Sequence, residues 1–296
     1  MLLSDSFRTH GALVVLVGVW TLGWFLTEVG LESSTPFSFT AVRFVLAAVL
    51  MQLILAWRQK RDALKRVEWV WVGLIGLFQT TLMFSLATYG LLQVGIAKAA
   101  ILIYSTPLWS SLLGWLFLKE RFTLLKCAGL MVGCVGMVVM VSPSLSKESF
   151  IGEALLVGSA MSWSVSSFLL KKYLPNADKL AIGTWQMTFG AIGLLVLALM
   201  VDGGVKFDVN AESLLAMLYV SIVGSVVAFS LWFYVVPRID LLHSSMASVA
   251  VPVAVLGIEG VVLEQHLDRT LLSASMLIIG GIVLVFLSDH IGRNER

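Results

Sequence analysis

Ten apolar runs, each between 18 and 24 residues long, make up most of this sequence. An α-helix needs ~20 mostly apolar residues to cross the hydrocarbon core of a bilayer. Strands of a membrane barrel are about 10 residues long and alternate polar with apolar side chains, which these runs do not. The sequence therefore predicts an all-α polytopic membrane protein with ten transmembrane helices. Numbered in chain order, the predicted spans are residues 11–29, 37–57, 67–90, 96–118, 124–141, 152–170, 180–201, 214–236, 241–263 and 271–288.

Composition supports this class. The chain is 58% hydrophobic and 13% charged, whereas soluble domains average about 25% charged residues. The formal net charge of +2 is too small to indicate a nucleic-acid partner. The expected surroundings are therefore a lipid bilayer.

The chain also contains an internal repeat. Residues 84–107 align without a gap with residues 229–252, at an offset of 145, and share five identities. A second block pairs Trp20 with Trp163 at an offset of 143. The sequence thus predicts two five-helix repeats, residues 1–145 and residues 146–296. Because each repeat has an odd number of spans, the second enters the membrane from the opposite side, as in the inverted repeats of secondary transporters.

The positions of the basic residues predict the orientation. If the N-terminus faces the cytoplasm, fifteen of the 20 lysines and arginines lie in cytoplasmic segments and four lie outside, with Arg43 inside a span. Cytoplasmic loops of membrane proteins are enriched in lysine and arginine. We therefore expect both termini in the cytoplasm of a protein of the inner (plasma) membrane.

Several motifs then suggest a family. They are Arg43-Phe44 in span 2, Pro107 in span 4, the turn Leu118-Lys119-Glu120-Arg121-Phe122-Thr123, and Gly129 with Gly133 in span 5. These features resemble the drug/metabolite transporter superfamily, in its EamA-type branch of ten helices in two five-helix repeats. The second half departs from the pattern, since the turn reads Leu263-Glu264-Gln265-His266-Leu267 and Ala274 stands opposite Gly129. The resemblance implies export or exchange of small metabolites, including amino acids, through a central cavity lined by spans 1, 3, 4, 6, 8 and 9.

Aromatic and polar residues at mid-depth are the candidates for substrate binding. Trp20 and Trp163 come from opposite halves, and each indole N–H needs a partner in an apolar setting. Trp24 lies one turn above Trp20, and Gln79 and Tyr104 are further polar groups at depth. The alternative for each is packing or a hydrogen bond between helices.

Two prolines at matching positions are candidates for kinks beside the substrate. Pro107 and Pro252 fall near the middle of spans 4 and 9. A proline inside a helix leaves the carbonyl four residues earlier without its usual donor. We expect the carbonyls of Ile103 and Ser248 to be freed in this way.

Residues near the span ends are candidates for gates. Tyr89 lies near the outer end of span 3, and its repeat mate Tyr234 near the inner end of span 8. Interfacial tyrosines that anchor the helices are the alternative. Lys98 and its mate His243 lie at the mouths of spans 4 and 9, where extension of the side chain to water is expected.

Arg43 is the charge that lies deepest in a span. Glu28, at the outer end of span 1, and Glu259, in the outer third of span 9, are the candidate partners for an ion pair. The alternative is that Arg43 binds a substrate carboxylate. Gln186 occupies the matching position in the second half, so this charge is not repeated.

Glycines in span 5 indicate close helix packing. Gly129 and Gly133 form a GxxxG motif, which lets two helices approach closely. We expect this contact inside a monomer, with a dimer interface as the alternative.

Taken with the family resemblance, these residues predict a secondary transporter of small neutral or zwitterionic metabolites, with amino acids as the expected substrates. A carrier of phosphorylated or nucleotide-linked metabolites is an alternative, but a dianion needs clustered basic groups at depth. Export of lipophilic drugs would use Glu28 or Glu259 for cations. A non-transporting membrane enzyme or scaffold is the remaining class. The sequence has no GxxxxGK[ST], HExxH or GxSxG motif, so we expect no catalytic site, cofactor, metal or ATP-driven step.

Overall fold

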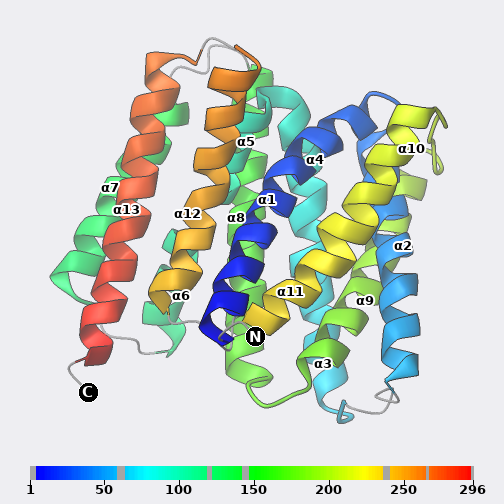
Figure 1. Cartoon of the computed structure of the whole chain (residues 1–296), viewed down its shortest axis with the longest axis horizontal. Helices are drawn as coiled ribbons and strands as arrows, with labels where there is room; N and C mark the ends of the chain where they lie inside the picture. The colour runs from blue at the N-terminus through cyan, green and yellow to red at the C-terminus, as the bar shows by residue number, and fades with distance from the viewer. Residues whose placement is uncertain are drawn as a thin grey trace.

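The computed structural model describes residues 5–58, 64–118, 122–141, 147–235, 241–264 and 267–294. Within these residues every regular element is a helix, and one isolated β-bridge joins Ser34 to Phe207. The helices stand side by side as a bundle (Figure 1). The prediction of an all-α fold is confirmed.

Each predicted span corresponds to a helix or to consecutive helical segments. The first half comprises α1 (Asp5–Leu31), α2 (Pro36–Trp57), α3 (Glu68–Ile75) continued by the π-helical segment η1 (Gly76–Leu82) and α4 (Met83–Val94), α5 (Ile96–Ile103) with α6 (Thr106–Leu118), and α7 (Leu124–Val141). The second half comprises α8 (Lys147–Tyr173), α9 (Lys179–Met200), α10 (Ala211–Leu218) continued by the π-helical segment η2 (Tyr219–Val227) and α11 (Ala228–Val235), α12 (Leu241–Gly257) with the π-helical segment η4 (Ile258–Val262), and α13 (Arg269–Asn294). Among the described residues, nine helices are long and apolar enough to cross a membrane, and the apolar stretch in span 9, Val249–Val262, is shorter.

The two halves run through the bundle in opposite directions. Both chain ends lie towards the same end of the bundle, at the bottom of Figure 1. Helix α1 rises from that end, and α8, five spans later, descends from the other end. Helices at matching positions of the two halves pack on each other: α7 lies along α13, and α2 lies along α9. The contact of span 3 with span 6, made by α4 and α8, is matched by the contact of span 8 with span 1, made by α10 and α11 with α1. The prediction of two inverted five-helix repeats is confirmed.

Small residues bring α7 and α13 into backbone contact. A Cβ atom added to Gly281 would lie 2.5 Å from the backbone nitrogen of Gly133 and 2.6 Å from the carbonyl oxygen of Gly129. The mirrored contact pairs Gly136 with Ala274, whose carbonyl oxygen would lie 2.9 Å from a Cβ at Gly136. The GxxxG motif of span 5 therefore packs against span 10 of the same chain, which is the intramolecular contact expected from the sequence.

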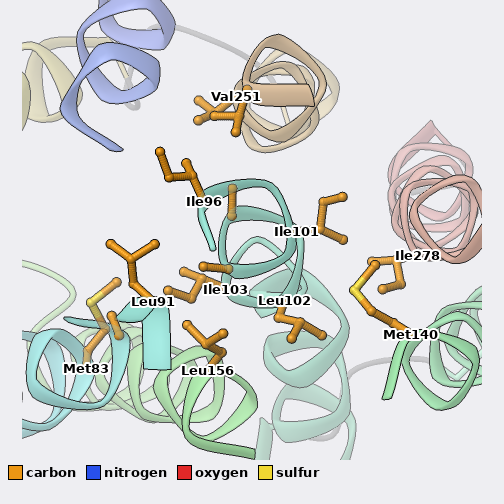
Figure 2. Packing of buried hydrophobic residues seen from close by; sticks show 14 of the residues in the cluster. Met83, Leu91, Ile96, Ile101, Leu102, Ile103, Met140, Leu156, Val251 and Ile278 are labelled. Carbon is orange, nitrogen blue, oxygen red and sulfur yellow. The ribbon is translucent and has the colours of Figure 1, made fainter. Parts of the chain in front are cut away.

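Helix α5 lies at the centre of the largest apolar core. Seven of its eight residues are buried, and Lys98 is the exception. Its buried side chains meet residues from α4, α7, α8, α12 and α13. Figure 2 shows this packing around Ile101, Leu102, Met140, Leu156 and Val251. Because α5 contacts both halves, groups at its two ends are well placed to couple them.

Candidate functional site

Span 4 is interrupted just before Pro107, at Tyr104 and Ser105. The carbonyl of Ile103, which the proline was expected to free, accepts a hydrogen bond of 2.7 Å from Thr106 Oγ1. Ser105 Oγ donates to the Leu102 carbonyl at 2.6 Å. Hydroxyl groups thus satisfy backbone carbonyls in the apolar interior, as a broken membrane helix requires.

The matching proline in span 9 behaves differently. Helix α12 continues through Pro252, which is buried. The positions matching Ser105 and Thr106 are Ala250 and Val251, which carry no hydroxyl group. The two prolines therefore do not produce matching breaks, and a helix interruption occurs in the first half alone among the described residues.

Four of the five predicted substrate-binding residues gather around the α5 core. Trp20, Trp24, Tyr104 and Trp163 all pack against it. The side chains of Trp24 and Tyr104 lie close enough to interact with each other. The Trp20 ring lies 5.7 Å from that of Trp232, between centroids. This places aromatic groups from both halves at mid-depth in one region.

Gln79, the fifth predicted residue, lies half-buried in η1. The next two residues of that segment bond to the other half: Thr80 Oγ1 donates to Gln186 Oε1 at 2.7 Å, and Thr81 Oγ1 donates to the Gly190 carbonyl at 3.1 Å. The structure thus shows contacts between the halves next to Gln79, while a role of Gln79 itself in substrate binding stays a prediction.

A cavity of about 350 Å³ opens where α1, α5, η4 and α13 meet. The start of α5 lines this cavity, and Figure 1 shows that α5 lies towards the end of the bundle away from the chain termini. The charged side chains on its wall are Glu28, Lys98, Glu259 and Asp268. We call this space the charged cavity.

Two of these charges are engaged by neighbouring elements. Glu259 is 6% exposed, and its Oε1 accepts a hydrogen bond of 3.1 Å from the backbone N–H of Ala97, at the start of α5. Lys98 forms an ion pair with Glu153 of α8, whose side chain is fully buried. Sequence reasoning expected Lys98 to extend to water and did not consider Glu153, although it is the only charged residue in predicted span 6.

One face of α1 connects the charged cavity with the aromatic groups. Glu28, Trp24 and Trp20 are spaced four residues apart, so they follow one another along the same side of the helix. Glu28 lies at the cavity, while Trp24 and Trp20 lie successively deeper. A solute entering the cavity would meet this face of α1.

Arg43 does not form the expected ion pair with Glu28 or Glu259. Its Nε donates to Ser225 Oγ of η2 at 3.1 Å. Its Cζ lies 5.1 Å from the ring centroid of Phe44 and 4.9 Å from that of Phe84. Helix α2 packs along α9 and against η2, with few contacts to α1, so Arg43 faces span 8 rather than the carboxylates at the cavity.

The Arg43 contact has a counterpart in the other half. Arg43 matches Gln186 at the offset of 143, and Ser225 matches Thr80 at the offset of 145. Arg43–Ser225 joins span 2 to span 8, while Gln186–Thr80 joins span 7 to span 3. The contact is repeated in geometry but not in charge. The sequence indicated this pair of contacts through Thr80 and Ser225, two hydroxyl residues at matching positions of apolar spans.

The two contacts sit in π-helical segments that also match. Shifting residues 76–82 of η1 by 145 gives residues 221–227, which lie inside η2. Such segments are rare and occur frequently at functional sites. The two segments differ in the residue that faces the neighbouring helix. A Cβ added at Gly76 would lie 2.6 Å from the Gln186 carbonyl oxygen, so η1 lies directly against the backbone of α9. The matching residue of η2 is Ser221, which already carries a Cβ. The contact of η1 with α9 is therefore the closer of the two.

A second carboxylate of the C-terminal half caps a helix of the N-terminal half. Asp202 Oδ2 accepts hydrogen bonds from the backbone N–H of Ser38 at 2.8 Å and from Thr35 Oγ1 at 2.5 Å. In the other repeat the matching amide, that of Ala181, is capped within its own helix by Asp178 at 3.0 Å. The end of the bundle away from the termini thus carries two caps between halves, made by Asp202 and Glu259.

The predicted gate residues are placed only in part. Tyr89 is 40% exposed and stacks on Phe37 of α2, with ring centroids 6.2 Å apart. The side chains of Tyr234 and His243 lie outside the described residues, as do residues 119–121 and 265–266 of the two family-like turns. Their roles remain predictions.

Comparison with known proteins gives consistent results. The EamA-like transporter family matches residues 10–142 and again residues 150–287. A protein of Escherichia coli (strain K12), named a probable amino-acid metabolite efflux pump, is 23% identical over 289 residues, which cover 94% of each chain. The uncharacterized transporter YoaV of Bacillus subtilis is 22% identical and covers 90% of this chain and 92% of its own. A solved crystal structure that is 21% identical aligns with a TM-score of 0.64 over 98% of this chain and 99% of that one, and so shares the fold.

Proposed function

Since the chain belongs to the EamA-like transporter family, we propose that it exports or exchanges small neutral or zwitterionic metabolites, with amino acids as the substrate class. The family consists of transporters rather than enzymes. The observation that carries the choice of substrate is the charged cavity, which presents carboxylates beside an aromatic face of α1. Two relatives named probable amino-acid metabolite efflux pumps agree with this choice.

Alternating access is the mechanism that suits the architecture. Two inverted copies of one fold can exchange conformations, which gives inward-open and outward-open states of similar energy. A substrate shifts this equilibrium only through a difference in its affinity for the two states. Residues that contact both halves, such as Glu259 at the start of α5, are the groups through which binding would act.

The chemistry of the cavity favours a substrate with an ammonium group. Glu28 and Glu259 on the cavity wall provide negative charge. Trp24 and Trp20 follow Glu28 along the same side of α1, and their ring faces suit cations and apolar side chains. A phosphorylated dianion is disfavoured, because Lys98 is the single basic side chain on the described cavity wall and is paired with Glu153. Export of lipophilic cations is the second candidate function, since the same two carboxylates would bind them.

The location and assembly are part of the proposal. The distribution of lysine and arginine supports cytoplasmic termini in an inner (plasma) membrane. We place the boundary between the repeats near residues 145 and 146. Packing of the GxxxG motif within one chain supports a monomer.

Counterflow in proteoliposomes tests the proposed substrate class. Liposomes containing the purified protein are loaded with one unlabelled amino acid at a time and given a trace of the labelled compound outside. We expect accumulation above protein-free liposomes for at least one of the twenty amino acids. Absence of counterflow for all twenty, together with accumulation of tetraphenylphosphonium, would replace amino acids by lipophilic cations as the substrate class.

A further inference from the structure

Arg43 lies within span 2 without a carboxylate partner among the described residues. It is seven residues after Pro36, which puts it about 10 Å from the start of α2 at about 1.5 Å per residue. An arginine at this depth is costly, and such residues commonly face a cavity or a polar partner. Glu28 and Glu259, the expected partners for an ion pair with Arg43, line the charged cavity instead.

The guanidinium group is held in place, yet most of its donors are unused. Ser225 takes the hydrogen of Nε, and the rings of Phe44 and Phe84 lie against Cζ. An arginine has five N–H donors, so four remain on its two terminal nitrogens. No described residue accepts a hydrogen bond from those four. A planar group held in this way presents a preformed fork for a carboxylate or phosphate.

The surroundings of Arg43 connect it with the predicted substrate region. Phe84 packs against both of the two largest core clusters, and so does Trp163. Trp163 in turn stacks on Phe229 at 6.4 Å between centroids. Gly224 of η2 lies against the guanidinium, because a Cβ added there would be in contact with Nη2 at 3.9 Å.

From this geometry we infer that Arg43 binds the carboxylate group of the transported substrate. The inference rests on the proposed function, and it adds the residue that separates substrates with a carboxylate from amines without one. The substrate carboxylate would then be bound by the N-terminal half alone. The matching residue of the C-terminal half, Gln186, is neutral and already accepts a hydrogen bond from Thr80. The phosphate of a lipid headgroup offers the same chemistry and has to be distinguished by experiment.

The test compares four proteins purified in detergent. They are the wild type, Arg43→Gln, Arg43→Lys, and the control Gln52→Leu, which removes another polar contact of α2, the 3.0 Å hydrogen bond to Thr188. Arg43→Gln introduces the residue found at the matching position of the other repeat. Arg43→Lys retains the positive charge and so provides a second variant if the glutamine variant unfolds.

The readout is the thermal unfolding midpoint as a function of ligand concentration. The ligands are the amino acid with the strongest counterflow, the amide of that amino acid, and sodium acetate against sodium chloride. We expect the amino acid to stabilise the wild type and Gln52→Leu, with its dissociation constant raised at least about tenfold in Arg43→Gln and less in Arg43→Lys. The amide has no carboxylate, so the wild type should bind it weakly. The Arg43→Gln variant should bind the amide as weakly as the wild type does.

Each outcome decides a separate point. Equal binding of amino acid and amide by the wild type, with no effect of Arg43→Gln, would overturn the role of Arg43 while the transport proposal stands. If no amino acid binds but acetate stabilises the wild type and not Arg43→Gln, Arg43 binds carboxylates and the amino-acid proposal fails. If delipidated protein responds through Arg43 to phosphatidylglycerol and to no carboxylate, Arg43 is a lipid contact and the inference is wrong.

Discussion

Glu259 of the second half accepts a hydrogen bond from the backbone N–H of Ala97 in the first half, and so caps α5 from the opposite repeat. A carboxylate at a helix N-terminus satisfies a free N–H and interacts favourably with the helix dipole. Glu259 also faces the charged cavity, where Glu28 adds a second negative charge. A substrate that attracts the Glu259 carboxylate would therefore compete with the cap that joins the two halves.

Substitution of Glu259 tests whether this cap stabilises the fold. We expect Glu259→Ala to lower the free energy of unfolding by about 1 kcal/mol, the usual effect of losing a helix cap. Glu259→Gln should lose less, because its amide oxygen can still accept the bond. Thermal unfolding in detergent measures both, and Glu28→Gln is the matched control, since Glu28 lines the same cavity but is exposed. Equal midpoints for Glu259→Ala and Glu28→Gln would contradict the capping role.

The Asp202 cap should control local opening of α2. Asp202→Ala removes the acceptor of the Ser38 amide, and we expect faster hydrogen exchange in the first turn of that helix. The matched variant Asp178→Ala should speed exchange at the start of α9, where Asp178 caps Ala181, and leave α2 unchanged. Exchange followed by mass spectrometry gives the comparison. No change at α2 in Asp202→Ala would show that the contact between halves does not hold this end.

Lys98 and Glu153 should depend on each other. Glu153 is fully buried, so replacing Lys98 by methionine removes the countercharge of a buried carboxylate. We expect a loss of about 1–3 kcal/mol for Lys98→Met. The double variant Lys98→Met/Glu153→Gln should recover part of this loss, because it leaves no buried charge. A double-mutant cycle of thermal stabilities measures the coupling, and strict additivity would mean that the pair is not an energetic unit.

The backbone contact between α9 and η1 should reject even a methyl group. A Cβ added at Gly190 would overlap with the side chain of Thr80. We expect Gly190→Ala to cost about 1–3 kcal/mol through overpacking. Gly23→Ala is the control, because nothing lies within 4 Å of a Cβ at that helical position. Thermal unfolding should separate the two variants, and a tolerated Gly190→Ala would show that η1 can shift away from α9 at little cost.

The sequence by itself determined which segments are helices and how the two halves are related. Inside a bilayer every backbone N–H and carbonyl must be satisfied within the protein, so an apolar run of about 20 residues has helix as its solution. The odd number of spans per repeat then requires inversion. Proline alone did not determine the interruption of span 4, because helix α12 continues through the matching Pro252.

Only the tertiary structure decided which polar side chains meet. In α2 the buried faces of Phe44, Ala47 and Met51 alternate with the exposed Val49 and Leu53, and all five are apolar. Where lipid and protein interior are equally apolar, hydrophobic periodicity does not show which side of a helix faces its neighbours. Helix rotation therefore had to be known before Arg43 could be assigned to Ser225 instead of a carboxylate, or Lys98 to Glu153. The caps made by Asp202 and Glu259 depend on the same rotations and on contacts between residues more than 160 positions apart.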